Sequence, residues 1–263
     1  TRTRRKTVAP RLEQIINITY GFFKDQTPRL RFQTLVFFDR VFTLFKKQRA
    51  TFFTFNVQLI TAGLADPVPR IQQRTCDFLS HFIDGTPAER LAQFFPTVFD
   101  LLYAIIAARN QQTIAEATCA LSYAVIQVKK GFAPQFTRFL PVLQQVLKAT
   151  PLCYESMEIK GRIIECLSII GLNLGGEYAK ETTTAIFEEI NAIMKTPNID
   201  VEDTIFGYIE TSLTRLAELI PEQFVTILPT IMELIWTRAE INIATSSFSD
   251  SEVETKVVNG EEY

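Results

Sequence analysis

The sequence predicts an all-α solenoid, in which hairpins of two helices stack in a row. Long apolar segments alternate with short turns, and only 10 of the 263 residues are glycine. Such segments favour helices over the short, turn-rich strands of a sandwich or barrel. The third observation is an internal repeat, because similar groups of residues recur about 44 positions apart, a period typical of stacked helical units.

The clearest copies of this repeat are residues 71–82 and 159–176. Both begin with Ile-x-x-Arg, continue with an acid three residues after the arginine and then have Leu-Ser, at a displacement of 88 positions. A displacement of two periods implies further copies between and beside them.

Two series of positions place the helices. The first series opens the predicted second helices of the hairpins, called B helices, at Leu30, Ile71, Ile114, Ile159 and Ile205. The second series marks the first helices, called A helices, at Pro10, Phe55, Pro96, Pro141, Ala185 and Pro229. After each proline, apolar residues follow at the second, fifth and sixth positions, the spacing of one buried helix face. Proline is tolerated in the first turn of a helix and kinks it further in.

The two series interleave into five helix hairpins and an unpaired sixth A helix. We expect a basic terminus at 1–7, a solenoid at 8–240 and an acidic flexible tail or loop at 241–263. The expected repeats are 8–46, 49–84, 90–129, 134–174 and 177–220, followed by the last A helix at 222–240. A hairpin cannot bury both of its faces alone, so stacked copies of this length predict HEAT repeats.

Aspartates and cations recur at the turns before the B helices. Asp25, Asp66 and Asp200 stand five residues before a B helix, and Arg31 or Lys160 follows the start of two of them. Aspartate accepts backbone N–H bonds at turns. We expect the cation to pair with the aspartate of a neighbouring repeat, which would make this a structural ladder.

Composition excludes several classes of function. A net charge of -2 gives no general reason to expect direct binding of nucleic acid. The four cysteines form no CxxC pair, and His81 is the single histidine, so we expect buried reduced thiols and no metal. Most phenylalanines and Trp236 are expected in the core. No uncharged apolar run is long enough for a membrane span.

Motifs of catalysis are missing from the sequence. It contains no GxGxxG, P-loop, HExxH or GxSxG, and no carboxylate pair in an activating context. We therefore expect a protein that is not an enzyme and that needs no cofactor.

Charged residues of the B helices are the candidate protein-binding residues. Arg74 with Asp77, and Arg162 with Glu165, lie three positions apart. Each pair is either a local helix pair or part of a surface that grips an extended peptide across repeats. The full candidate set is Arg74, Asp77, Glu116, Arg162, Glu165 and Glu210. Asp200, Glu202 and Asp203 suit the start of a helix or an acidic contact for a basic partner.

A family resemblance adds biology to these patterns. The sequence IKGRIIECLSIIGLNLGGEY at 159–178 resembles the stretch LRGK-x-x-ECIS-x-IG-x-AVG-x-x-x-F of importin-β family nuclear transport receptors, in their beta-3 branch. Residues 25–31 resemble the D-x-x-P-R-V-R turn of these receptors, and 203–229 resemble the segment that follows. The acidic residues at 241–263 stand where that branch carries an acidic insertion. Lys160 departs from the motif, which has arginine there.

The resemblance implies a HEAT superhelix that binds cargo on its concave B-helix side. It further implies release of cargo by Ran-GTP, contact with Phe-Gly nucleoporins between A helices, and shuttling between cytoplasm and nucleus through the nuclear pore. The chain matches the middle of such a receptor, so we expect Ran binding in the longer receptor and not in this chain alone.

Three hypotheses of function follow. The first is a segment of a nuclear import receptor that binds basic or extended cargo signals. The second is a HEAT scaffold of a cytosolic multiprotein complex, such as a phosphatase complex, without a transport role. The third, an RNA-binding or export solenoid, needs a basic concave face that the B helices do not supply.

Overall fold

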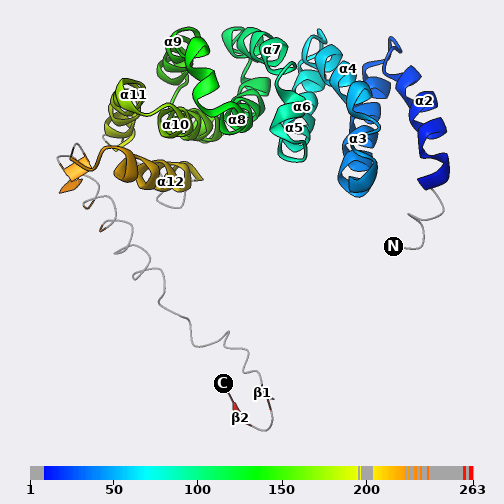
Figure 1. Ribbon diagram of the computed structural model, residues 1–263. Coiled ribbons are helices and arrows are strands. Elements are labelled where there is room, and N and C mark those ends of the chain that lie inside the picture. Colours follow the sequence, from blue (N-terminus) through cyan, green and yellow to red (C-terminus); the bar gives the residue numbers. More distant parts are fainter. Residues whose placement is uncertain are drawn as a thin grey trace.

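The structure is a row of helix hairpins. The computed structural model describes residues 9–194, 196 and 204–222, together with 224, 225, 228, 229, 232, 236, 257, 258, 261 and 262. Successive hairpins follow one another from the amino-terminal end to α12 (Figure 1). Residues 1–7, Asp200, Glu202 and Asp203, and most of 222–263 lie outside the described part.

The five A helices and five B helices alternate along the chain. The pairs are α2 (Leu12–Phe22) with α3 (Pro28–Leu44), α4 (Phe53–Leu64) with α5 (Pro69–Asp84), α7 (Phe95–Ala107) with α8 (Gln111–Val128), α9 (Ala133–Ala149) with α10 (Tyr154–Leu174), and α11 (Gly176–Met194) with α12 (Thr204–Leu219). Short elements lie between or beyond them: η1 (Ala9–Arg11), η2 (Lys46–Gln48), α6 (Ala88–Leu91), η3 (Lys129–Phe132), β1 (Val257–Val258) and β2 (Glu261–Glu262).

The hairpins form two layers. The B helices α3, α5, α8, α10 and α12 pack against one another in that order, and the A helices α4, α7, α9 and α11 do the same. The fold confirms the predicted all-α solenoid of five hairpins, and 221, 222, 224, 225, 228, 229, 232 and 236 are helical where the sixth A helix is expected. Pro96 lies in the first turn of α7 and Pro141 lies inside α9, as predicted.

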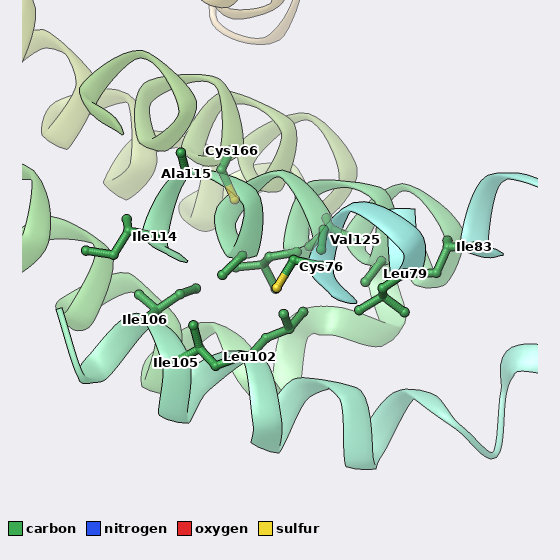
Figure 2. Packing of buried hydrophobic residues seen from close by; sticks show 14 of the residues in the cluster. Cys76, Leu79, Ile83, Leu102, Ile105, Ile106, Ile114, Ala115, Val125 and Cys166 are labelled. Atoms are coloured by element: carbon green, nitrogen blue, oxygen red, sulfur yellow. The ribbon is translucent and has the colours of Figure 1, made fainter. Parts of the chain in front are cut away.

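One apolar core runs through the whole stack. Figure 2 shows Cys76, Leu79 and Ile83 of α5 beside side chains of α7, α8 and α10. In α5, Ile71, Phe78 and Phe82 are almost completely buried, which places one stripe of the helix against its neighbours. Each such side chain stabilises the stack by about 1.5–3 kcal/mol through burial.

Two of the three aspartates predicted at the turns, Asp25 and Asp66, act as predicted. The N–H of Thr27 donates to Asp25 over 2.7 Å, and the N–H of Val68 donates to Asp66 over 2.9 Å. Arg31 binds Asp66 with two nitrogens, at 2.7 Å from Nε to Oδ2 and 3.1 Å from Nη2 to Oδ1. This cation therefore ties the first hairpin to the aspartate of the second hairpin, and the expected pairing is confirmed here.

The glycine pair after α10 ends that helix. Gly175 has φ of 70° and Gly176 has φ of 54°, a region that glycine enters without steric cost. The N–H of Gly175 donates to the carbonyl of Gly171 over 2.9 Å, which satisfies one of the last carbonyl groups of α10. The chain reverses at this point and begins α11.

Two expectations about buried side chains are wrong. Cys153 is exposed because it stands in the linker just before α10, although Cys76 and Cys166 are buried as expected. Burial raises the pKa of Cys166 to about 12. Trp236 is 61% exposed, because no described helix covers that side of its helical segment.

Lys160 pairs with an acid of the neighbouring repeat, as expected for its place, but that acid is Glu189 of α11 and not an aspartate at a turn. Its side chain is only 3% exposed, its Nζ donates to the carbonyl of Leu147 over 2.7 Å, and it forms an ion pair with Glu189. Lys160 therefore joins α10 to both flanking A helices, α9 and α11. Lys160, the position that departs from the importin-β pattern, thus makes a buried contact between helices of the solenoid.

A close contact between B helices makes Gly161 sensitive to substitution. A Cβ atom at Gly161 would lie 2.2 Å from Cδ2 of Tyr208, whereas one at Gly207 would meet nothing within 4 Å. We expect Gly161→Ala to lower the free energy of unfolding by about 1–3 kcal/mol. Gly207→Ala, the matched control, should raise it by up to about 1 kcal/mol. Urea unfolding of both variants checks this, and equal effects would contradict the close packing of α10 on α12.

The buried pair of Lys160 and Glu189 makes a second prediction. Lys160→Met should cost about 3–5 kcal/mol of stability, because it leaves the Glu189 carboxylate buried without its partner. Adding Glu189→Leu should restore most of that loss. Lys180→Met is the control, since the Lys180–Glu177 pair is exposed and contributes less than about 1 kcal/mol. Thermal and urea unfolding measure these effects, and a harmless Lys160→Met would contradict the assigned role.

Candidate protein-binding face

Polar side chains form a continuous face along the B helices. This B-helix face consists of Gln73, Arg74, Asp77, His81, Glu116, Cys119, Tyr123, Glu158, Arg162, Glu165, Tyr208 and Arg215, from α5, α8, α10 and α12. On α5, α8 and α10 most of these residues recur three or four positions apart, and Tyr208 and Arg215 of α12 are seven positions apart, about two helical turns. That spacing places them on one side of the helix.

Between α3 and α5 the face is organised by a buried aspartate. Asp39 of α3 forms an ion pair with Arg74 and lies 2.9 Å from Nδ1 of His81 through its Oδ1 atom. Arg74 also contacts Asp77 at 3.3 Å, so the predicted helix pair is present. Arg74 thus connects two repeats as well as two turns of one helix.

Between α5 and α8 the connection is a hydrogen bond. Nε2 of Gln73 donates to Oε1 of Glu116 over 2.6 Å. Glu116, a predicted candidate, is half-buried beside α5. Its remaining carboxylate oxygen is the group that it can present to a partner.

Arg162 is the centre of the face between α8, α10 and α12. Its guanidinium lies 3.5 Å from Glu165, 3.9 Å from Glu158 and 3.8 Å from Sγ of Cys119. The same group stacks over the Tyr208 ring, 5.1 Å from its centroid. Such a cation–π contact contributes about 0.5–2 kcal/mol, depending on desolvation.

Arg215 completes the connection from α10 to α12. Its Nη2 lies 3.7 Å from Oε1 of Glu165, and its Nη1 donates to Oγ of Ser168 over 3.1 Å. Every neighbouring pair of B helices from α3 to α12 is therefore joined by at least one polar contact on this face.

Two acids of the face, Asp77 and Glu158, are more exposed to solvent than the arginines that they contact, whereas Glu165 is only 23% exposed. The Asp77 side chain is 42% exposed and Arg74 is 20% exposed, while Glu158 is 63% exposed and Arg162 is 31% exposed. Partial burial raises the pKa of Asp77, an effect that the Arg74 charge opposes. At these two positions a partner that approaches the face therefore meets a carboxylate before it meets the guanidinium group.

The predicted candidates fall into three groups in the structure. Arg74, Asp77, Glu116, Arg162 and Glu165 lie on the B-helix face in the contacts described above. Glu210 is exposed on α12, but it stands two residues from Tyr208 and so on another side of the helix from the α10 contact. The acidic residues Asp200, Glu202 and Asp203 lie outside the described residues.

Several residues of these contacts were not among the candidates predicted from the sequence. Cys119 and Tyr123 follow Glu116 at helical spacing, so extending the stripe by one or two turns would have found them. Asp39, Tyr208 and Arg215 could not be found in this way. Their roles depend on which repeat each side chain reaches, and this is set by the packing of one hairpin on the next.

Two grooves lie beside the helices that form the two layers. One, of about 500 Å³, lies between the first turns of α3 and α5 and is lined by Phe32 and Arg70 among others. Another, of about 380 Å³, lies between the A helices α7 and α9 and is lined by Phe95, Phe99 and Pro134 among others. Among the described residues, no group of three potential metal ligands occurs and no helix is long and apolar enough to cross a membrane.

Comparison with known proteins identifies sequence relatives in two organisms. No family model matches the chain. It is 20% identical to importin subunit beta-3 of Saccharomyces cerevisiae over 223 residues, which cover 84% of this chain and 20% of that protein. It is 22% identical to the probable importin-5 homolog of Dictyostelium discoideum over 188 residues, or 72% of this chain and 16% of that protein. The chain thus spans about a fifth of the length of these relatives.

Solved structures show the same fold. Kap121p bound to Nup53p matches with a TM-score of 0.75 and 16% identity, covering 98% of this chain and 25% of that one. Kap121p bound to RanGTP matches with a TM-score of 0.72 and 18% identity, covering 85% and 21%. Kap121p bound to Pho4p gives a TM-score of 0.72 and 18% identity over 86% and 21%.

These likenesses agree with the resemblance carried by residues 159–178 and by the turn at 25–31. The sequence relatives are importins, and the fold is that of a karyopherin HEAT solenoid. The chain is thus similar in sequence to importins and has the fold of the solved Kap121p structures.

Proposed function

We propose that this chain is the cargo-binding segment of a nuclear import receptor and that it is not an enzyme. The observation that supports the proposal is the B-helix face, where polar contacts join each repeat to the next and the carboxylates of Asp77 and Glu158 are exposed to solvent. Repeats held in fixed register can present acids at regular intervals. An extended basic segment of a cargo protein fits such a surface.

The electrostatics of the face favour a basic partner. Asp77, Glu116, Glu158 and Glu165 come from three successive B helices and outnumber the three arginines of the face, Arg74, Arg162 and Arg215. Asp77 and Glu158 contact Arg74 and Arg162 but remain 42% and 63% exposed. Charges of opposite sign speed association and select the partner more than they raise affinity. The likeness to Kap121p bound to Pho4p supports a protein ligand for this fold.

Two further partners belong to the longer receptor. Ran-GTP would release cargo there, a proposal supported by the likeness to Kap121p bound to RanGTP. Phe-Gly nucleoporins would insert a phenylalanine between A helices, and the groove lined by Phe95 and Phe99 has the apolar character that this needs. The receptor would then shuttle between cytoplasm and nucleus through the nuclear pore.

The proposed domain limits follow the sequence. Residues 8–240 would form the solenoid and 241–263 an acidic loop or tail. The alternative, a scaffold of a phosphatase or similar complex, has no support among the relatives, which are importins.

Neutralising the open acids should weaken the binding of a basic peptide. We expect Asp77→Asn and Glu158→Gln each to lower the affinity for a lysine-rich extended peptide by about two- to fivefold, the range of partly exposed charge pairs. Glu177→Gln, which removes an exposed acid from the A helix α11, should leave the affinity unchanged. Fluorescence anisotropy with the lysine-rich peptide and a glutamine-substituted twin makes the measurement.

The same binding should depend on pH in a defined direction. The pKa of Asp77 is raised above the ordinary 3.8, so lowering the pH through that raised pKa neutralises Asp77 and weakens binding. Asp77→Asn should lose this part of the dependence. Equal affinity for the lysine-rich peptide and its glutamine twin would contradict the proposed cargo chemistry.

The transport role itself is tested with the full-length receptor. Cargo complexes captured with that receptor should dissociate when Ran-GTP is added and persist when Ran-GDP is added. Complexes that are indifferent to the nucleotide state of Ran would remove the transport role and leave a scaffold function.

A further inference from the structure

A basic pocket lies where two consecutive linkers between hairpins meet. It has a volume of about 250 Å³ and is lined by Lys46, Arg49, Ala50, Phe53, Gly85, Thr86, Pro87 and Arg90. Lys46 and Arg49 belong to the linker from α3 to α4, whereas Gly85, Thr86 and Arg90 belong to the connection from α5 to α7. The pocket is thus formed by residues other than those of the B-helix face.

Arg49 is held rigidly at the base of this pocket. Its Nε donates to the carbonyl of Phe42 over 2.9 Å, and its Nη1 donates to the carbonyl of Gly85 over 3.1 Å. Its guanidinium also stacks on the Phe42 ring, 4.2 Å from the centroid. These partners are uncharged, so they fix the position of the cation without neutralising it.

Glycine at position 85 is what allows this arrangement. A Cβ atom there would lie 2.5 Å from Nη1 of Arg49 and 2.8 Å from Cε1 of Phe42. The contact is too close for any side chain, so the second linker approaches the guanidinium through its bare backbone. The pocket is therefore a built feature of the packing between two repeats.

The pocket is lined by cations and by no acidic residue. Lys46, Arg49 and Arg90 contribute three cations, and none of the lining residues carries a carboxylate. Arg90 is exposed, with its guanidinium 6.0 Å from the Phe53 ring centroid. The first 90 residues of the chain contain 15 Lys and Arg against 7 Asp and Glu, whereas 91–263 contain 12 against 22. The pocket thus lies in the basic part of the chain.

We infer that this pocket binds a phosphate monoester, carried by a phosphorylated serine or threonine of a partner peptide. A phosphoryl group carries a charge of about -1.5 to -2 and three acceptor oxygens, which suits a pocket lined by three cations better than a single carboxylate does. Arginine nitrogens in a fixed plane are suited to phosphate oxygens. Binding would also relieve the mutual repulsion of Lys46, Arg49 and Arg90.

The pocket suits a phosphorylated peptide better than it suits the surface of a membrane. Ala50, Phe53 and Pro87 give it an apolar part beside the cations, where residues flanking a phosphoserine can pack. Asp84 and Glu89 are exposed and stand next to pocket residues in the sequence, so a broad anionic surface would meet them as well. This inference does not rest on cargo binding, and its failure would leave the proposed function untouched.

The test measures anisotropy of a labelled Gly-Ala-phosphoserine-Ala-Gly peptide and of its serine twin. We expect the phosphorylated peptide to bind at least about tenfold more tightly, as charge-assisted hydrogen bonds to several cations imply. Inorganic phosphate should compete with it. Lys46→Gln and Arg90→Gln should each weaken binding about three- to tenfold. Both residues are exposed, so these variants should fold normally.

Arg40→Gln is the matched control, because Arg40 is an exposed cation of α3 that does not line the pocket. It should bind the phosphorylated peptide with unchanged affinity. Equal binding of the two peptides would overturn the inference, as would an equal loss of affinity in Arg40→Gln. Binding to vesicles that contain phosphatidylserine, without binding of the phosphorylated peptide, would replace it with a membrane contact.

Discussion

Burial between successive hairpins is the interaction on which the rest of this structure depends. Each hairpin has apolar side chains on the faces toward both of its neighbours, and it covers them only by stacking on the next copy. Almost every large residue of the shared core, such as Leu79 or Leu167, packs within this stack. Because stability is shared between neighbours, the position of each helix is set by the hairpins beside it.

Polar contacts between repeats fix the position of each hairpin relative to the next in this apolar stack. Arg31 with Asp66, Arg74 with Asp39, and Lys160 with Glu189 each join different hairpins. Apolar packing alone tolerates small sliding of one helix on another, whereas a bidentate ion pair fixes one position. A surface that binds a partner over several repeats needs hairpins in fixed relative positions, because its binding residues come from different hairpins.

The solenoid has three separate surfaces, on the B helices, between the A helices and at the linkers between hairpins. The B helices present acids, the groove between α7 and α9 is lined with phenylalanine, and the linkers between hairpins gather Lys46, Arg49 and Arg90. Each surface uses a different part of the repeat, so one can change without disturbing the others. Cargo binding on the B-helix face and phosphate binding in the linker pocket are therefore independent proposals.

The sequence by itself determined the fold class, the B-helix segments and the turns, because helical periodicity, the proline positions and Asp25 and Asp66 are local signals. It also placed Arg74, Asp77, Arg162 and Glu165 on polar helix sides. Only the tertiary structure decided that Lys160 is buried with Glu189, that Asp39 organises Arg74 and His81, and that Arg49 reaches Gly85. These contacts join residues 29 to 42 positions apart, and the sequence pattern of one helix carries no information about which neighbouring repeat its side chains meet.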